Sequence, residues 1–177
     1  MKYFYYTRHG QTIWNVENKI CGATDIGLTE LGHKQAEELG QKILKEGIKI
    51  DEILYSPLSR AADTAKHIGK VTGMREEIRL KEQNFGKYES TPRHGEEFEE
   101  AKKSFINHFD GGESMFEMAQ RIYNLLDDLK KESGEKTYLL VAHNGISRVV
   151  NSYFHDMTNE EYAAFGVKNC AVVRYDF

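Results

Sequence analysis

The amino-acid sequence predicts an α/β fold, a three-layer α/β/α sandwich with a mostly parallel central sheet. The main observation is that segments typical of strands alternate along the chain with segments typical of amphipathic helices. The second is the apolar run 137–142, which is typical of a strand buried inside such a sheet. The third is the length of 177 residues, which suits one domain with a sizeable core, so we expect residues 1–177 to form a single domain.

Short segments rich in aromatic and β-preferring residues predict the strands, which are 2–7, 51–56, 78–80, 137–142 and 170–177. Apolar stripes at helical spacing predict the helices, which are 27–47, 56–73, 93–109, 113–134 and 145–154. Local signals support two of the helix starts. Thr29 is a candidate N-cap, and so is Ser56, with Pro57 at the first helical position after it.

Composition and charge exclude several classes of function. The chain is 40% hydrophobic and 29% charged, which is ordinary for a globular protein. Its net charge is -4 and it has no basic tail or stripe, which argues against a nucleic acid as its partner. No run approaches the roughly 18 apolar residues that a membrane-spanning helix needs, so we expect no membrane association. An anionic small molecule remains compatible with an acidic protein, because a single pocket can still be cationic.

The two cysteines, Cys21 and Cys170, form no CxxC pattern, which predicts reduced thiols in a cytosolic protein. The first residues lack the apolar run and the small-residue cleavage site of a signal peptide, so we expect a cytoplasmic location. The sequence leaves the oligomeric state open, a homo-oligomer included.

Polar residues follow three of the predicted strands at the point where each strand ends. Arg8 and His9 come after the first strand, Arg60 lies in the first turn after the second, and His143 follows the run 137–142. Because the carboxyl ends of parallel strands meet at one edge of a sheet, we expect these four side chains to converge. Such a cationic cluster repels itself unless it holds an anion, and arginine matches phosphate oxygens well.

A phosphate pocket that contains histidine suggests nucleophilic catalysis. A neutral imidazole can attack phosphorus and carry the phosphoryl group covalently. The arginines would offset charge in the transition state, and a nearby carboxylic acid would protonate the leaving oxygen. Spacing alone does not choose that acid among the 28 Asp and Glu residues.

Each of these residues also has an ordinary structural interpretation when it is taken alone. Arg8 and His9 before a glycine are typical of a solvated turn, Arg60 of a helix surface, and His143 of a core histidine bonded to backbone. Other kinds of site find less support, because no HxH or HExxH spacing predicts zinc and no GxxxxGK[ST] run predicts a P-loop. We therefore expect no metal site.

Five segments together resemble a known family. They are TRHGQTIWNVENKICGATDIGLTELGHKQA near the start, SPLSRAADTA, LKEQNFGKYE, GGES with the predicted helix that follows it, and YLLVAHNGISRVV near the end. In this order they resemble the histidine phosphatase superfamily, in its branch of cofactor-dependent phosphoglycerate mutases and related phosphatases. The resemblance covers nearly the whole chain.

The resemblance implies roles for particular residues. His9 would be the phosphorylated nucleophile, and Arg8, Arg60 and His143 would hold the phosphate. Glu82 matches the position of the family's proton donor and is preferred over Glu89. The substrate-binding positions implied by the resemblance are Asn15, Gln11, Thr12, Cys21, Gly22 and Asn144. Asn144 stands where the family usually has glycine, and its side chain could replace the backbone donor there. The resemblance implies no metal or organic cofactor.

Chain length favours one reaction over another. The glycolytic mutases that this chain resembles carry an added segment between the acid and the Gly-Glu-Ser motif, whereas only a lid-like segment around 83–111 fills that gap here. A shorter lid exposes a phosphohistidine to water, so we expect a phosphatase acting on a small phosphorylated metabolite. A mutase is the first alternative, and a catalytically silent module that binds phosphorylated ligands is the second.

Overall fold

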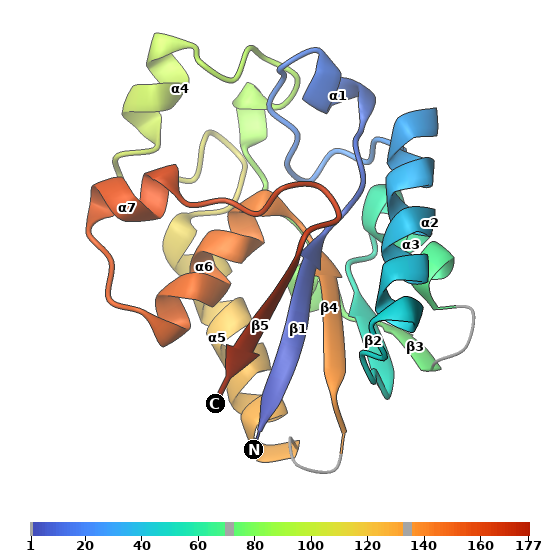
Figure 1. The fold of residues 1–177 in the computed structure, drawn as a ribbon. Coiled ribbons are helices and arrows are strands. Elements are labelled where there is room, and N and C mark those ends of the chain that lie inside the picture. Colours follow the sequence, from blue (N-terminus) through green and yellow to red (C-terminus); the bar gives the residue numbers. More distant parts are fainter. Residues whose placement is uncertain (1, 70–72, 133–135) are drawn as a thin grey trace.

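A five-stranded sheet forms the centre of the computed structural model, which describes residues 2–69, 73–132 and 136–177 (Figure 1). Its strands are β1 (Tyr3–Arg8), β2 (Glu52–Tyr55), β3 (Gly73–Glu76), β4 (Tyr138–Ala142) and β5 (Val172–Asp176). They lie in the order β3-β2-β4-β1-β5. All neighbouring pairs are parallel except β1 and β5, so the predicted mostly parallel sheet is confirmed.

The strand register brings three chain segments to the same edge of the sheet. Arg8 at the end of β1 pairs with Ala142 at the end of β4, and Tyr55 at the end of β2 pairs with Val141. The residues that follow these strands therefore start side by side. The predicted convergence of strand ends depends on this alignment.

Helices cover both faces of the sheet, as the three-layer prediction requires (Figure 1). One face packs against α5 (Met115–Glu132) and α6 (Asn144–Phe154), and the other against α2 (Glu30–Lys45) and α3 (Ser59–Ile68). Strand β4 is buried throughout because its side chains pack against the helices on both faces of the sheet. Its Leu140 points to the α5 and α6 side, whereas Leu139 and Val141 point to the α2 and α3 side.

Shorter elements gather beyond the carboxyl ends of the strands (Figure 1). They include α1 (Ile13–Val16), α4 (Glu96–Ala101), α7 (Asn159–Ala164) and the 3-10 turn Gly86–Tyr88. A small separate core of Ile20, Tyr88, Phe98 and Phe109 holds the lid segment, 83–111, against the loop after α1. These elements enclose the space above the sheet edge.

The strand predicted at 78–80 is wrong. Those residues form a 3-10 turn, Ile78–Leu80, and the strand that pairs with β2 is Gly73–Glu76. The Glu77 side chain accepts a hydrogen bond from the backbone of Arg79 and so favours the turn. Strand β3 is a short, mostly exposed edge strand, so it has no apolar alternation that the sequence pattern could reveal.

The helix predicted at 93–109 is much shorter, because α4 ends at Ala101. The Asn107 side chain accepts a hydrogen bond from the backbone of Phe109, and Phe109 itself has a positive φ of 55°, so the chain turns instead of continuing the helix. The helix predicted from Ser56 starts three residues later, at Ser59, with Leu58 as its N-cap. Thr29 is the N-cap of α2, as predicted.

The predicted helices 56–73 and 113–134 reach into residues 70–72 and 133–135, which lie outside the described residues. Two short helices were not predicted, α1 and α7, although both carry a capping box at their start. For α7 the signature is Thr158 with Glu161 three residues later, a pattern readable from sequence. In the described part of the chain, no helix combines the length and hydropathy needed to cross a membrane.

Candidate active site

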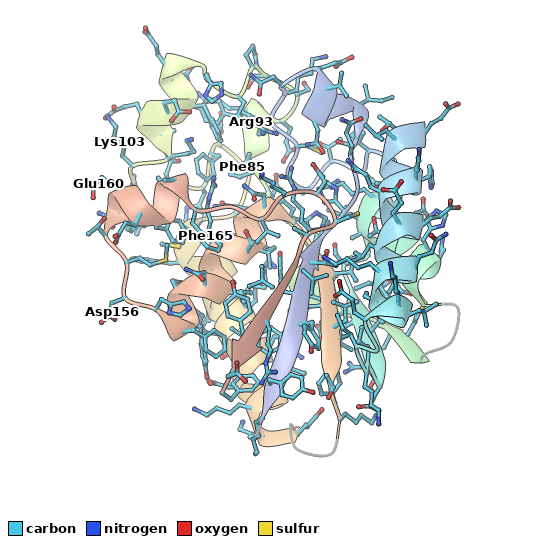
Figure 2. All side chains as sticks on the ribbon, viewed as in Figure 1. Phe85, Arg93, Lys103, Asp156, Glu160 and Phe165 are labelled. Atoms are coloured by element: carbon cyan, nitrogen blue, oxygen red, sulfur yellow. The ribbon has the colours of Figure 1, made fainter. Side chains whose placement is uncertain are left out.

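A cavity of about 510 Å³ opens at the carboxyl edge of the sheet. Its floor comes from the residues after β1 and β4, and its walls come from the lid segment and α7. Figure 2 shows Phe85, Arg93, Lys103 and Glu160 around this region, beyond the ends of the strands. The predicted site residues that line the cavity are Arg8, His9, Asn15, Cys21, Glu82 and Asn144.

His9 has one nitrogen fixed by the backbone. Its Nδ1 lies 2.7 Å from the carbonyl oxygen of Gly10, and since that oxygen can only accept, Nδ1 carries the proton. Nε2 is then the unprotonated nitrogen. The ring is 4% exposed, and the Asn169 side chain donates a 2.7 Å hydrogen bond to the carbonyl oxygen of His9. His9 is therefore held as a neutral imidazole in a fixed orientation.

His143 and Arg60 lie behind His9 and are fully buried. The rings of His9 and His143 are 5.2 Å apart between centroids. Arg60 Nε donates to His143 Nδ1 over 3.2 Å, so the proton of His143 is on Nε2, which lies 2.7 Å from Ser56 Oγ. The buried Ser56 hydroxyl thus supports His143 instead of capping α3, contrary to the sequence prediction.

Arg60 also ties the loop after α1 to the sheet edge. Its two terminal nitrogens donate to the carbonyl oxygens of Thr24 and Gly22, at 2.9 and 2.6 Å. A guanidinium has five N–H groups, so three bonds to protein leave two N–H groups for a ligand. Arg60 and His143 do not line the cavity in this structure, but the His143 ring lies beside that of His9, and Arg60 is bonded to His143.

Burial and positive charge keep both histidines neutral. Burial lowers the pKa of His9 well below its ordinary value of 6.5, and the charges of Arg60 and Arg8 lower it further. Burial, Arg60 and His9 lower the pKa of His143 in the same direction. Neutral imidazole is the form that can act as a nucleophile or accept a hydrogen bond at physiological pH.

Arg8 has hydrogen-bonding capacity that the protein does not use. Its Nη1 donates to the carbonyl oxygen of Val167 over 3.3 Å. Its Nε is the only buried side-chain nitrogen or oxygen without a partner among the described residues. Burial, with the nearby charge of Arg93, lowers the pKa of Arg8 to about 10. A buried cation with an unused donor at a cavity wall is suited to binding an anion.

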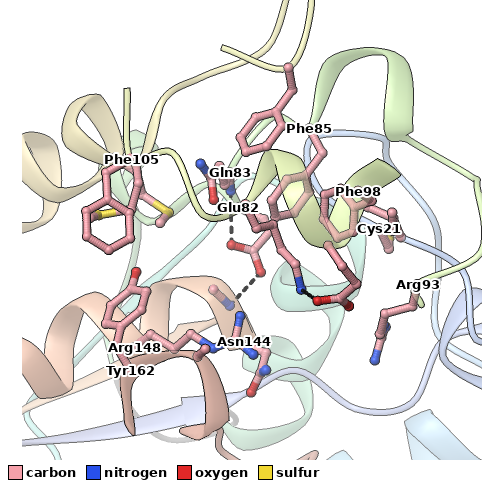
Figure 3. Close-up of a pocket in the computed structure, with 18 of the residues that line it drawn as sticks. Cys21, Glu82, Gln83, Phe85, Arg93, Phe98, Phe105, Asn144, Arg148 and Tyr162 are labelled. Atoms are coloured by element: carbon pink, nitrogen blue, oxygen red, sulfur yellow. Dashed lines mark hydrogen bonds and ion pairs between the residues drawn. The ribbon is translucent and has the colours of Figure 1, made fainter. Parts of the chain in front are cut away.

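Glu82 is held at the cavity by two backbone groups. Its Oε1 accepts from the backbone N–H of Gln83, and its Oε2 accepts from the backbone N–H of Gly145, both over 2.9 Å. A side chain at position 145 would bring its Cβ within 2.4 Å of Oε1, so glycine is needed for this approach. Glu82 is only 6% exposed, and its side chain lines the cavity (Figure 3).

Glu89, the alternative acid, has a different environment. Its carboxylate accepts from the backbone N–H groups of Gly22, Ala23 and Phe85 at 2.9–3.0 Å. Glu89 therefore fixes the loop that Arg60 also holds and does not line the cavity. This environment fits a structural carboxylate better than a proton donor.

The remaining predicted residues divide into two groups. Asn15 and Asn144 line the cavity, and Asn144 Oδ1 also accepts from the backbone of Val167 at 3.0 Å. Gln11 and Thr12 do not line it. Gln11 accepts a 3.0 Å hydrogen bond from Thr29 at the start of α2, and Thr12 caps α1.

Cys21 lines the cavity, whereas Gly22 supports it through its backbone. Burial raises the pKa of the Cys21 thiol, so the thiol is kept protonated. Among the described residues, no group of three or more His, Cys, Asp and Glu side chains is placed to hold a metal ion.

Several cavity residues were not identified from the sequence. Phe98 and Phe105 come from the lid segment, Arg148 from α6 and Tyr162 from α7. Asn169, which holds the backbone of His9, was also missed. The capping box of α7 could have revealed that helix, but no local signal places it over a cavity formed by residues far away in the chain.

Comparison with known proteins identifies the class. The sequence profile of the histidine phosphatase superfamily (branch 1) matches residues 4–177, and the chain belongs to this superfamily. The expected family and fold are thereby confirmed.

The relatives of this chain are named for different activities. The chain is 33% identical over 183 residues to a protein of Yersinia pestis named "Probable phosphoglycerate mutase GpmB", covering 98% of this chain and 84% of the relative. It is 31% identical, with a TM-score of 0.83, to a phosphoserine phosphatase of Entamoeba histolytica in complex with 3-phosphoglyceric acid, covering 100% of this chain and 91% of the other. It is 25% identical, with a TM-score of 0.83, to a mycobacterial glucosyl-3-phosphoglycerate phosphatase, covering 98% and 89%.

Proposed function

We propose that this protein is a phosphatase that hydrolyses small phosphomonoesters through a phosphohistidine intermediate on His9. The observation that carries the proposal is the fixed tautomer of His9, whose Nδ1 is bonded to the Gly10 carbonyl so that Nε2 keeps its lone pair. The nearby guanidinium of Arg8, with its unused Nε, supports anion binding at the same place. Membership of the superfamily supports the reaction type.

In the first half of the reaction, His9 Nε2 attacks the phosphorus in line with the leaving alkoxide. The N–P bond forms, the P–O bond breaks, and Glu82 gives its proton to the leaving oxygen. This step requires the carboxylic acid form of Glu82. Its two backbone hydrogen bonds hold it in place at the cavity.

In the second half, the carboxylate of Glu82 takes a proton from a water molecule as that water attacks the phosphorus. The N–P bond breaks, inorganic phosphate leaves, and Glu82 is protonated again for the next turnover. Arg8 would hold the phosphoryl oxygens throughout, and Arg60 would contribute its two unspent N–H groups. His143 would contribute after its ring shifts from Ser56 toward the bound phosphoryl group.

The proposed substrate is a small phosphorylated metabolite, and the lid segment would determine which metabolite the protein accepts. One relative binds 3-phosphoglyceric acid, and another is named for glucosyl-3-phosphoglycerate, which supports phosphorylated acids as the first compounds to test. The segment 83–111 would act as the lid, because its Phe85, Phe98 and Phe109 form much of one cavity wall.

A phosphoglycerate mutase is the second candidate, and the name of the Yersinia relative supports it. Both reactions share the phosphohistidine, so product analysis distinguishes them. With 3-phosphoglycerate as substrate, a phosphatase releases inorganic phosphate and glycerate, whereas a mutase produces 2-phosphoglycerate without net phosphate release. Dominant isomerisation would favour the mutase over our proposal.

The direct test is to trap the intermediate. The protein is mixed with 4-nitrophenyl phosphate, quenched at high pH, where phosphohistidine survives, and digested for mass spectrometry. We expect the phosphoryl group on the peptide that contains His9 and release of inorganic phosphate in solutions containing a chelator. A phosphoryl group on another residue, or no turnover across a broad panel of phosphomonoesters, would contradict the proposal and favour a silent binding module.

A further inference from the structure

A second group of hydrogen-bond donors lines the cavity on the side of α6 and α7. It consists of the Arg148 guanidinium, the Tyr162 hydroxyl and the Asn144 amide. Figure 3 shows Arg148 and Tyr162 side by side below Glu82, with Asn144 next to the Arg148 guanidinium. We call these three residues the α6–α7 donor group.

The protein uses only part of the hydrogen-bonding capacity of these side chains. Arg148 Nε donates to the carbonyl oxygen of Phe165 over 2.9 Å, which fixes the direction of the guanidinium. Asn144 is oriented by the bond from the backbone of Val167 to its Oδ1. Within the described residues, the terminal nitrogens of Arg148, the amide nitrogen of Asn144 and the hydroxyl of Tyr162 form no hydrogen bond. The unused groups are therefore donors, apart from a hydroxyl that can donate or accept.

The charge around the cavity also favours an anion. Five cationic side chains line it (Arg8, Arg93, Lys102, Lys103 and Arg148), against three carboxylates (Glu82, Glu99 and Glu160). Two of these cations are paired with carboxylates, Lys102 with Glu99 at 3.0 Å and Lys103 with Glu100 at 2.5 Å, and Glu82 is bound to two backbone N–H groups. Arg148 therefore has no carboxylate partner among the described residues, although the protein as a whole is acidic.

Apolar side chains also line the cavity. Phe85, Phe98 and Phe109 contact one another on the lid side, with ring centroids 5.3–6.2 Å apart. Phe105 approaches the Tyr162 ring at 6.4 Å. Met115 and Met118 add further apolar surface. A flat, apolar body would lose little hydration free energy in such a space.

We infer that the α6–α7 donor group is a subsite for a second anionic group of the substrate, a carboxylate or a second phosphoryl group, carried on an apolar body. The inference rests on the proposed function, because it assumes that Arg8 binds the transferred phosphoryl group next to His9. Arg148 and Tyr162 are then specificity-determining residues. They bind the part of the substrate that does not react.

Arg8 and Arg148 line the same cavity of about 510 Å³, so one small molecule can contact both. Burial, Arg93 and Glu82 influence the pKa of Arg8 most, and the charge of Arg148 also lowers it. Burial raises the pKa of Tyr162, while Arg148 lowers it, so these two groups are also electrostatically coupled. The Tyr162 hydroxyl stays protonated and can donate to an anion.

Binding of hydrolysis-resistant phosphonates tests the subsite without turnover. We would measure by calorimetry the Kd of benzylphosphonates that carry at position 4 a hydroxymethyl, a carboxylate or a phosphonomethyl group. The carboxylate and phosphonomethyl compounds carry a second anionic group. The wild-type protein should bind one or both of them at least about 10-fold more tightly than the hydroxymethyl compound. The stronger of the two identifies which anion the subsite takes.

Two variants examine the residues separately. Arg148→Met should weaken binding of the preferred compound with a second anionic group about 10- to 100-fold relative to binding of the hydroxymethyl compound, because the substitution removes charge-assisted hydrogen bonds. Tyr162→Phe removes a single oxygen and should reduce the same ratio about 3- to 10-fold. Matched controls are Arg75→Met on the exposed edge strand β3 and Tyr123→Phe on α5, which should leave the ratio unchanged.

The outcomes separate this inference from the proposed function. If Arg148→Met weakens all three phosphonates equally, Arg148 binds the transferred phosphoryl group and the subsite assignment is wrong. The subsite assignment is also wrong if the wild-type protein shows no preference for the two compounds that carry a second anionic group. This outcome does not depend on whether either variant folds. Turnover of the corresponding aryl phosphates is measured in parallel, and its absence would contradict the proposed function while the binding data still decide the subsite.

Discussion

The molecule contains two pairs of histidine rings with the same separation, 5.2 Å between centroids. One pair is His9 and His143 at the carboxyl edge of the sheet. The other is His33 on α2 and His67 on α3, where His33 Nδ1 and His67 Nε2 lie 3.0 Å apart. Ring proximity alone therefore does not distinguish a candidate active site from a contact between helices.

The surroundings make the difference. Arg60 contacts His143 and Arg8 precedes His9, so the first pair is buried beside cations and neither ring bonds to the other. One hydrogen bond joins the rings of the second pair, so one ring has its lone pair used by the other, and the carboxylate of Glu37 lies 3.5 Å from His67 Nδ1. An imidazole whose lone pair is already used by a neighbour is a poor nucleophile, whereas His9 keeps its Nε2 unused.

The two pairs are connected by a close contact between glycines. Gly10 follows His9, and Gly32 precedes His33. A Cβ on Gly10 would lie 2.3 Å from the carbonyl oxygen of Gly32, and a Cβ on Gly32 would lie 2.1 Å from that of Gln11. Helix α2, which carries His33, therefore supports the loop that carries His9.

The largest expected effect is on His9, the proposed nucleophile. His9→Ala should reduce hydrolysis of 4-nitrophenyl phosphate by about 10³-fold or more, because it removes the atom that forms the bond to phosphorus. The matched variant is His33→Ala, which removes a ring from the other pair and should retain activity within about twofold. Steady-state rates at pH 7 measure both, and comparable losses in the two variants would contradict the distinction drawn here.

The carboxylates beside the two pairs offer the next comparison. Glu82→Gln should slow the first phosphoryl transfer from an alkyl phosphomonoester by about 10²- to 10⁴-fold, since the amide cannot protonate the leaving oxygen. The loss should be smaller for 4-nitrophenyl phosphate, whose leaving group needs little protonation. Rapid-quench measurement isolates this step, with Glu37→Gln as the control. An equal loss for both substrates would rule out Glu82 as the acid.

The glycine contact between the pairs allows a test of their mechanical connection. Gly32→Ala should lower the free energy of unfolding by about 1–3 kcal/mol, because its Cβ meets backbone that cannot move easily. Activity should fall as well, since His9 and Gly10 shift. Urea denaturation measures the stability, with Gly27→Ala as the control, because a Cβ there meets nothing within 4 Å. A stable and fully active Gly32→Ala variant would contradict the inferred support.

The smallest effect concerns pH. The pKa of His9 is lowered in the folded protein, so between that lower value and about 6.5 the unfolded chain binds a proton that the folded chain does not. The resulting stability is fully present above pH 6.5 and is lost as the pH falls through this window, by up to about 1.4 kcal/mol per pH unit. His9→Gln should therefore be less sensitive to pH than the wild type when urea denaturation is compared at pH 7.0 and 5.5. If the free energy of unfolding changes equally with pH in the two proteins, the lowered pKa of His9 is contradicted.

Local pattern predicted the fold well where the apolar signal was strong. The buried strand at 137–142 and the helix capped by Thr29 are described by their own residues, since periodicity and capping are local properties. Prediction was wrong where the structure depends on distant partners. Strand β3, for example, exists because it pairs with β2.

The sequence by itself determined which polar side chains follow the strands, and the alignment of parallel strands then required Arg8, His9 and His143 to share one edge. Only the tertiary structure decided the separate environments of Glu82 and Glu89, and which donors from α6 and α7 surround the cavity. The reason is physical. Glu82 is oriented by the backbone of Gly145, a partner 63 positions away, and no local propensity encodes a hydrogen bond across that distance.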